Sequence, residues 1–151
     1  MPNLQTVLSP AVTLLIGFGV LIFSYRQWRL AKDKFRLDLF EKRYKVYEAA
    51  LIYLSAVVAH ADVRNDDLHN YNRGTMDAVF LFGPEINNYI KELRRRSLQM
   101  QLYQKMFTPL PVGTERSGLV QQETDELMWL SDQFLELPLI FERYLGFGKA
   151  R

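Results

Sequence analysis

The stretch LQTVLSPAVTLLIGFGVLIFSYRQWRLAKDK, residues 4–34, decides how this 151-residue chain is organised. Residues 1–25 contain no charged side chain. A helix over residues 4–25, about 22 residues, covers about 33 Å, close to the ~30 Å hydrocarbon thickness of a bilayer. A basic collar follows directly and consists of Arg26, Arg29, Lys32, Lys34 and Arg36. The pattern predicts a transmembrane anchor over residues 1–25 and a basic juxtamembrane collar over residues 26–36.

The two ends of the anchor carry different signals. The helix begins either at Leu4 or at Pro10, because Ser9 followed by Pro10 is a helix-start signal. At the other end, amphipathic rings and long cationic side chains suit the headgroup region. The predicted membrane-interface residues are Tyr25, Arg26, Trp28, Arg29 and Lys32.

The charges around the anchor predict its orientation. Between residues 26 and 45 the basic residues outnumber the acidic ones, Asp33, Asp38 and Glu41. By the positive-inside rule, the C-terminal part lies in the cytoplasm and the short N-terminus lies outside. A cleaved signal peptide is disfavoured, because residues 1–6 carry no basic side chain and no small-residue cleavage motif precedes the collar.

Composition limits the chemistry of the remaining chain. About 125 residues follow the anchor, enough for one small domain. The chain has no cysteine, which excludes disulfides, thiolate-bound metals and cysteine-based catalysis. No nucleophile with its base, glycine-rich phosphate loop or pair of acids stands out. We therefore predict no catalytic residue, cofactor or nucleic-acid partner.

Apolar spacing predicts an all-α domain over residues 37–151. Apolar and aromatic residues recur at intervals of three and four, at Leu37, Phe40, Tyr44, Tyr47, Leu51, Leu54 and Val58. No Pro or Gly interrupts residues 20–73. We expect this amphipathic helix to continue directly from the membrane span and to end near His60.

Cap and breaker residues delimit the later helices. The second is expected after a cap at Asp66 or Asp67 and ends at Gly83, and the third begins at Pro84. The third reaches Phe107, ahead of a loop over residues 108–113.

The last helix is expected to have Thr114 as its N-cap and to stop before Pro138. A short final segment, residues 139–145, docks on the others. The chain is thus expected to form a cytoplasmic bundle of about four helices.

Two polar clusters are candidate sites. The first interhelical connection holds two imidazoles and three carboxylates, from His60, Asp62, Asp66, Asp67 and His69. These are permissible metal ligands, but a polar loop with a helix cap explains them better. The second cluster, on the third helix, consists of Lys91, Arg94, Arg95 and Arg96. Pairing with the acidic fourth helix explains this basic cluster better than a phosphate site does. The acidic residues of that helix are Glu123, Asp125, Glu126 and Asp132.

Aromatic and small residues supply the remaining candidates. Tyrosines at helical spacing are expected in the core, and Tyr44 and Tyr47, with Arg94, Arg95 and Arg96, are the candidates for an interaction surface. A stripe of small residues, Ser9, Thr13 and Gly17, permits close helix approach in lipid.

Four stretches carry a resemblance to a known group: LDLFEKRYKVYEA (37–49), FLFGPEI (80–86), PVGTER (111–116) and WLSDQ (129–133). They resemble a group of short bacterial single-pass membrane proteins of unassigned function, with an N-terminal span and a helical cytoplasmic domain. The resemblance covers nearly the whole chain. It implies an anchor, a bundle and a bacterial inner membrane, and it carries over no catalytic residue.

The leading hypothesis is a non-enzymatic inner-membrane protein whose cytoplasmic bundle is an interaction or assembly module. Its expected partners are membrane lipid, with anionic headgroups at the collar, and either another protein or a second copy of the chain. One alternative is a membrane-tethered, metal-dependent enzyme that uses the His60–His69 loop. The other is a small membrane-active effector, such as a toxin or defence component, that acts by oligomerisation of the span.

Overall fold

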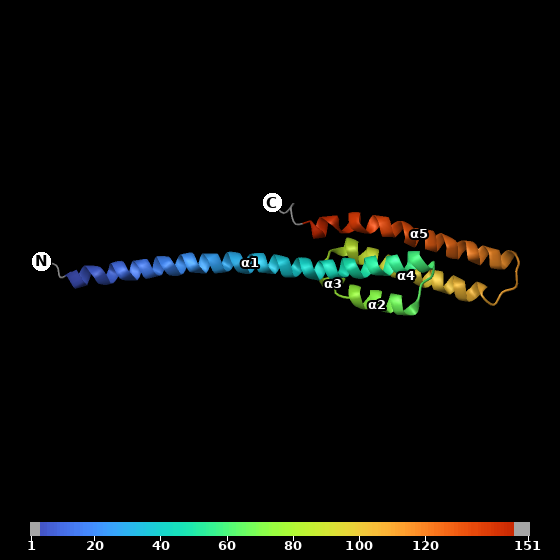
Figure 1. The fold of residues 1–151 in the computed structure, drawn as a ribbon, viewed down its shortest axis with the longest axis horizontal. Helices are drawn as coiled ribbons and strands as arrows, with labels where there is room; N and C mark the ends of the chain where they lie inside the picture. The colour runs from blue at the N-terminus through green and yellow to red at the C-terminus, as the bar shows by residue number, and fades with distance from the viewer. Residues whose placement is uncertain (1–3, 147–151) are drawn as a thin grey trace. The chain divides into compact units, whose positions relative to one another are not determined.

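The computed structural model of the protein describes the backbone of residues 4–146 and the side chains of residues 16–146. Five helices follow one another along the chain (Figure 1): α1 Leu4–His60, α2 Asn65–Thr75, α3 Ala78–Leu81, α4 Pro84–Phe107 and α5 Thr114–Leu145. No strand occurs within residues 4–146, which confirms the all-α class. The first helix begins at Leu4 rather than Pro10 and ends at His60, as predicted.

The chain divides into two compact units, residues 1–39 and residues 40–151. In the first unit, every side chain described from Ile16 to Asp38 is exposed. Among the described residues, no helix offers a segment that is both long and apolar enough to cross a membrane. Residues 1–15, more than half of the predicted anchor, have side chains outside the described part.

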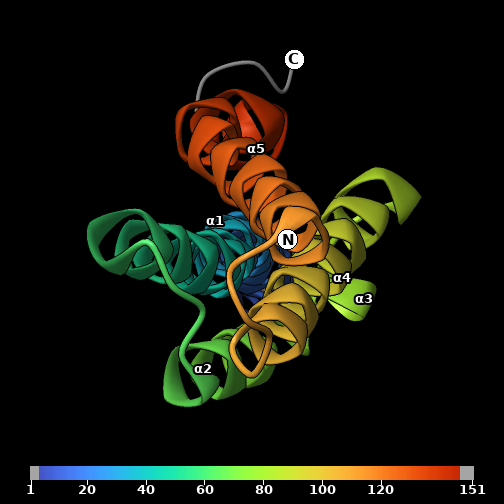
Figure 2. The ribbon, with the colours of Figure 1, turned by 90° about the vertical axis from the view of Figure 1, so that its right-hand side faces the viewer.

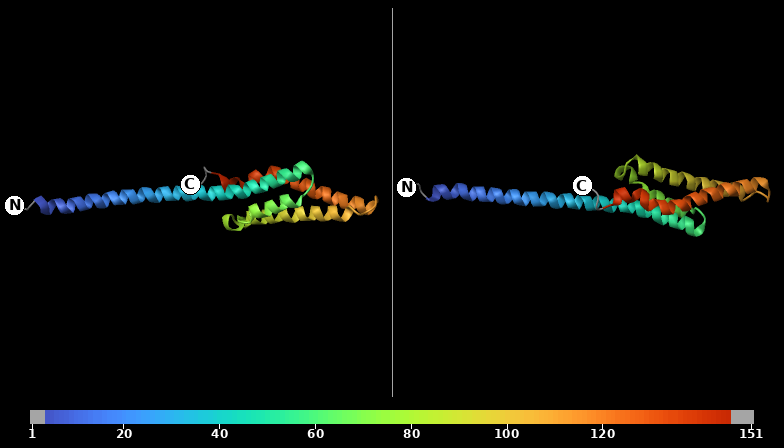
Figure 3. Two further views of the ribbon diagram at one scale, coloured as in Figure 1. Left: turned by 60° about the horizontal axis from the view of Figure 1, so that its bottom comes forward. Right: turned by 90° about the horizontal axis from the view of Figure 1, so that it is seen from above.

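The second unit is a bundle in which four helices pack together, the end of α1 with α2, α4 and α5. Viewed along the bundle, α2 and α5 lie on different sides of α4 (Figure 2), and the hairpin of α4 and α5 is visible in Figure 3. The core contains side chains from all four helices. Its fully buried members include Val46, Ala50, Leu54, Tyr71, Ile86, Leu93, Met100, Leu130, Leu137 and Phe141.

The buried face of α1 differs in part from the predicted one. Leu54 is fully buried, as expected, but Tyr44 is 43% exposed and Val58 44% exposed. The prediction selected large side chains, whereas the small Ala50 is completely buried where the helices approach one another. Helix packing buries whichever residues face the neighbours, and small residues allow the closest contact.

The predicted cap of α2 was wrong. Asp66 and Asp67 lie in the first turn of the helix, and Arg64 is the N-cap residue, with an extended backbone and no side-chain cap. Carboxylates in a first turn still interact favourably with the positive end of the helix dipole. The two aspartates therefore stabilise the helix start from within it.

The second predicted helix is in fact two helices. α2 ends at Thr75, and the short α3 follows after a turn at Asp77. Gly74 packs so closely on α1 that an added Cβ would lie 2.5 Å from the Ala49 Cβ. The Phe82 ring, further along, contacts Phe141 of α5. The chain has to change direction between these two packing contacts, which breaks the helix.

Pro138 does not end the last helix, as the sequence had suggested. It lies inside α5, which continues to Leu145, so residues 139–145 are part of α5 and not a separate segment. A proline inside a helix costs about 3 kcal/mol. Leu137 and Phe141, four residues apart and both fully buried, offset this cost because they hold one face of α5 against the core. Pro138 itself is exposed.

Candidate functional site

The predicted membrane-interface residues lie on the first unit's part of α1. The rings of Tyr25 and Trp28 are 62% and 60% exposed, and their centroids are 6.2 Å apart. The Lys32 Nζ lies 5.4 Å from the centre of the Trp28 ring, within the range of a cation–π contact. Arg26 and Arg29 are also exposed. These side chains form an open surface of aromatic rings and cations.

Tyr44 and Tyr47 have different environments in the bundle. The Tyr47 ring is half-buried, with its centroid 5.6 Å from that of Phe141. The Tyr44 ring lies further out, stacked at 5.9 Å on Phe40 and tilted at 5.8 Å against Tyr47. Tyr47 is therefore a packing residue, whereas Tyr44 presents an aromatic surface to the outside.

The basic cluster of α4 is partly neutralised within the bundle. The Arg96 guanidinium donates to Glu126 of α5 at 3.2 Å and lies 4.3 Å from the centre of the Trp129 ring. Pairing of this cluster with the acidic fourth helix is thus confirmed at Arg96. Arg95 pairs within α4, with its Nε 2.7 Å from a Glu92 oxygen. Hydrogen bonds from Arg95, and then from Arg96, lower the pKa of Glu92 to about 2. Arg94 is exposed.

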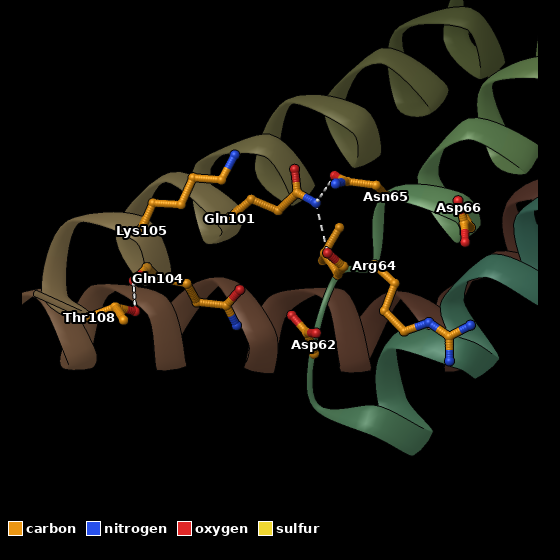
Figure 4. A pocket seen from close by; sticks show the side chains of 9 residues that line it. Asp62, Arg64, Asn65, Asp66, Gln101, Gln104, Lys105 and Thr108 are labelled. Carbon is orange, nitrogen blue, oxygen red and sulfur yellow. Dashed lines mark hydrogen bonds between the residues drawn. The ribbon is translucent and has the colours of Figure 1, made fainter.

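The His60–His69 connection forms an open polar pocket with α4 (Figure 4). Its volume is about 520 Å³, and its lining includes Asp62, Asn65, Asp66 and Gln101. The Gln101 amide points at the connection and donates to the Val63 carbonyl at 2.7 Å and to Asn65 Oδ1 at 3.0 Å. The arrangement ties the connection to α4.

This pocket does not assemble a metal site. Over residues 16–146, no group of three histidine or carboxylate side chains lies in an arrangement that could hold a metal ion. His60 and His69 are both exposed. The proposed His60–His69 ligand set is therefore not brought together.

The small-residue stripe falls largely outside the described side chains. Ser9 and Thr13 belong to residues 1–15, and only Gly17 can be placed. A Cβ added at Gly17 would meet nothing within 4 Å, so this position is open.

A pair of buried tyrosines lies at the centre of the bundle. The rings of Tyr53 and Tyr71 stack with centroids 4.6 Å apart. The Tyr53 hydroxyl donates to Ser97 Oγ at 2.5 Å, and the Tyr71 hydroxyl donates to the Ile90 carbonyl at 2.9 Å. Burial raises the pKa of Tyr53 to about 12 and the pKa of Tyr71 well above its ordinary value. These phenols are neutral, hydrogen-bonded core groups that join α1 and α2 to α4.

A second pocket combines cations that the sequence analysis did not single out as a site. In the sequence, Lys42 and Lys45 belong to the basic excess behind residues 1–25, and Arg73 stands on a later helix. The pocket brings all three together between α1 and the end of α2. No local motif signals this, because Arg73 comes from a different helix.

Comparison with protein-family models, with curated proteins and with solved structures gives no match to this chain.

Proposed function

We propose that this protein is a single-pass bacterial inner-membrane protein whose cytoplasmic helical bundle is an interaction or assembly module. The observation that carries the proposal is the uncharged apolar stretch over residues 1–25, followed directly by the basic collar. Large apolar side chains in the described part of that stretch support it. They range from 47% exposed at Ile22 to 68% exposed at Leu21. Burial in lipid removes this apolar surface from water.

The residues behind the stretch support a position at the lipid headgroups. Tyr25 and Trp28 present amphipathic rings, and Lys32 lies over the Trp28 ring. Aromatic residues are enriched at membrane interfaces, and each basic residue near an anionic surface contributes about 1 kcal/mol. The collar is thus suited to anionic lipid on the cytoplasmic side.

Topology can be tested directly, because the chain has no cysteine to remove. Single cysteines are introduced by Asn3→Cys and Gln122→Cys and probed in spheroplasts with a membrane-impermeant maleimide. Gln122 is exposed on α5. The proposal expects labelling of the cysteine at position 3 in intact spheroplasts and of the cysteine at position 122 only after lysis. The reverse pattern, or release of the protein by alkaline carbonate, would overturn it.

The interaction role depends on Tyr44. Tyrosine is enriched at binding hot spots, since it buries a large area at low entropic cost. The Tyr44 ring is 43% exposed and stacks on the Phe40 ring. Binding is therefore the role that this surface supports best.

A photoreactive amino acid in place of Tyr44 tests this role in native membranes. The matched control places it at Leu135, a 73% exposed position on α5. We expect a discrete adduct from position 44 and none from position 135. An adduct with the mass of two chains identifies self-association, and a heavier or lighter one identifies another protein. Equal labelling from both positions, or none, would contradict an interaction surface at Tyr44.

A further inference from the structure

The pocket between α1 and the α2–α3 turn concentrates positive charge. Its volume is about 520 Å³. The side chains that line it are Lys42, Lys45, Val46, Arg73, Gly74, Asp77, Phe80 and Leu81. Three cations and one carboxylate thus line a cavity large enough for a small ligand.

Close helix packing creates this convergence. Lys42, Lys45 and Ala49 share one side of α1, since they are three and four residues apart. Gly74 lies against Ala49, so close that an added Cβ would come within 2.5 Å of the Ala49 Cβ. Arg73, next to Gly74, is thereby held beside the two lysines. A glycine at position 74 is what permits α2 to approach this near.

The pocket cations differ from Arg95 and Arg96 of α4 in their ion pairing. Within residues 16–146, none of Lys42, Lys45 and Arg73 forms an ion pair, and Asp77 forms none either. By contrast, Arg95 and Arg96 are paired with carboxylates. Like charges held together repel one another, so this arrangement favours an anion from outside the bundle.

An aromatic ring completes the pocket. Phe80 is 85% exposed, although its neighbours Ala78 and Phe82 are buried. The short α3 is held in place because Arg43 Nε donates to the Leu81 carbonyl at 3.0 Å. Phe80 is therefore an exposed ring between two buried residues of the chain. Val79 and Met76, close to it in sequence, are also exposed apolar residues.

We propose that this pocket binds a phosphate ester. Lys42, Lys45 and Arg73 bind the phosphate oxygens, and Phe80 contacts the apolar or aromatic part of the same molecule. Charge-assisted hydrogen bonds from lysine and arginine are the ordinary means of phosphate recognition. Two sources share this chemistry, a phospholipid headgroup and a soluble organic phosphate such as a nucleotide. The site does not depend on the anchor or on the Tyr44 surface.

The test uses the full-length protein in an uncharged detergent, titrated calorimetrically with two probes. One probe is dihexanoyl phosphatidylglycerol below its micelle concentration, and the other is ATP without metal. The test variant carries Lys42→Gln, Lys45→Gln and Arg73→Gln. The matched control removes the same charge elsewhere, through Lys91→Gln, Arg94→Gln and Lys105→Gln, all at exposed positions. Circular dichroism verifies that both variants are folded.

We expect saturable binding of one probe, weakened about tenfold or more in the pocket variant and by less than about threefold in the control. Phe80→Ala should weaken binding several-fold without changing the net charge. Binding of the lipid alone identifies a headgroup site, and binding of ATP alone identifies a soluble ligand. No saturable binding of either probe, or equal losses in the pocket and control variants, would overturn the proposal.

Discussion

The two units of this chain differ in that only the bundle has a buried apolar core among its described side chains. From Ile16 to Phe23 the large apolar side chains are exposed, whereas the bundle completely buries Leu54, Leu93 and Phe141. Both regions are helical and both are rich in large apolar residues. The difference lies in what covers them, because helix formation alone buries little apolar surface and tertiary packing supplies the rest. The bundle buries its core side chains between its own helices, and under the proposed function lipid would cover the apolar side chains of the first unit.

The largest effect that this comparison predicts comes from truncating a core leucine. Leu93→Ala removes a fully buried side chain from the centre of α4 and is expected to cost the bundle about 2–5 kcal/mol of unfolding free energy. Urea unfolding is followed by Trp129 fluorescence in a Trp28→Phe background, so that only the bundle is observed.

The matched change in the first unit is Phe23→Ala, at a ring that is 62% exposed. It is expected to alter the unfolding free energy of the bundle by less than about 0.5 kcal/mol. Equal destabilisation by both substitutions would contradict this comparison, because it would mean that Phe23 contributes to the bundle as much as the buried Leu93 does.

A smaller effect is expected from the buried phenol of Tyr53 at high pH. Its pKa is raised from 10.0 to about 12, so its contribution to stability is complete below pH 10 and is lost as the pH rises through about 12. The corresponding loss is about 2–3 kcal/mol. Tyr53→Phe lacks this ionisation.

The wild type and the Tyr53→Phe variant should therefore exchange their order of stability as the pH rises. At pH 7, Tyr53→Phe should be about 1 kcal/mol less stable than the wild type, because the hydrogen bond to Ser97 is lost. Near pH 12 the order should reverse, because the wild type loses about 2–3 kcal/mol there and the variant does not. A constant difference across this range in urea unfolding would show that the Tyr53 hydroxyl is not held neutral by the core.

The smallest effect separates two arginines of α4. Arg96→Ala leaves Glu126, whose side chain is 13% exposed, without its ion-pair partner and removes the contact with Trp129. The expected cost is about 1–2 kcal/mol. Arg94→Ala, at an exposed position, is expected to cost less than about 0.5 kcal/mol. Thermal unfolding followed by circular dichroism measures both, and equal costs would mean that the Arg96 contacts contribute nothing to stability.

Local signals in the sequence predicted several boundaries correctly. The end of the first helix near His60, the start of α4 at Pro84 and its end at Phe107 were all anticipated. Proline at a first helical position marks a boundary reliably, since it has no amide hydrogen to satisfy there. The prediction that α5 stops before Pro138 was wrong, because the burial of Leu137 and Phe141 outweighs the local cost of a proline inside the helix.

The candidate sites were only partly predictable. Pairing of α4 with the acidic helix was expected from charge alone, but the choice of Arg96 over Arg94 depends on which face of α4 meets α5. The Lys42, Lys45 and Arg73 pocket has no sequence signature, since its cations lie about 30 residues apart in two helices.

The sequence by itself determined the helical class, the absence of cysteine chemistry, and the uncharged stretch with its basic collar. Each of these depends on composition or on spacing along one helix, which local physics governs. Only the tertiary structure decided that Tyr44 is exposed while Tyr53 is buried, and that Gly74 brings Arg73 beside two lysines. Such outcomes depend on which helices meet and on how closely they approach, and no single helix carries that information.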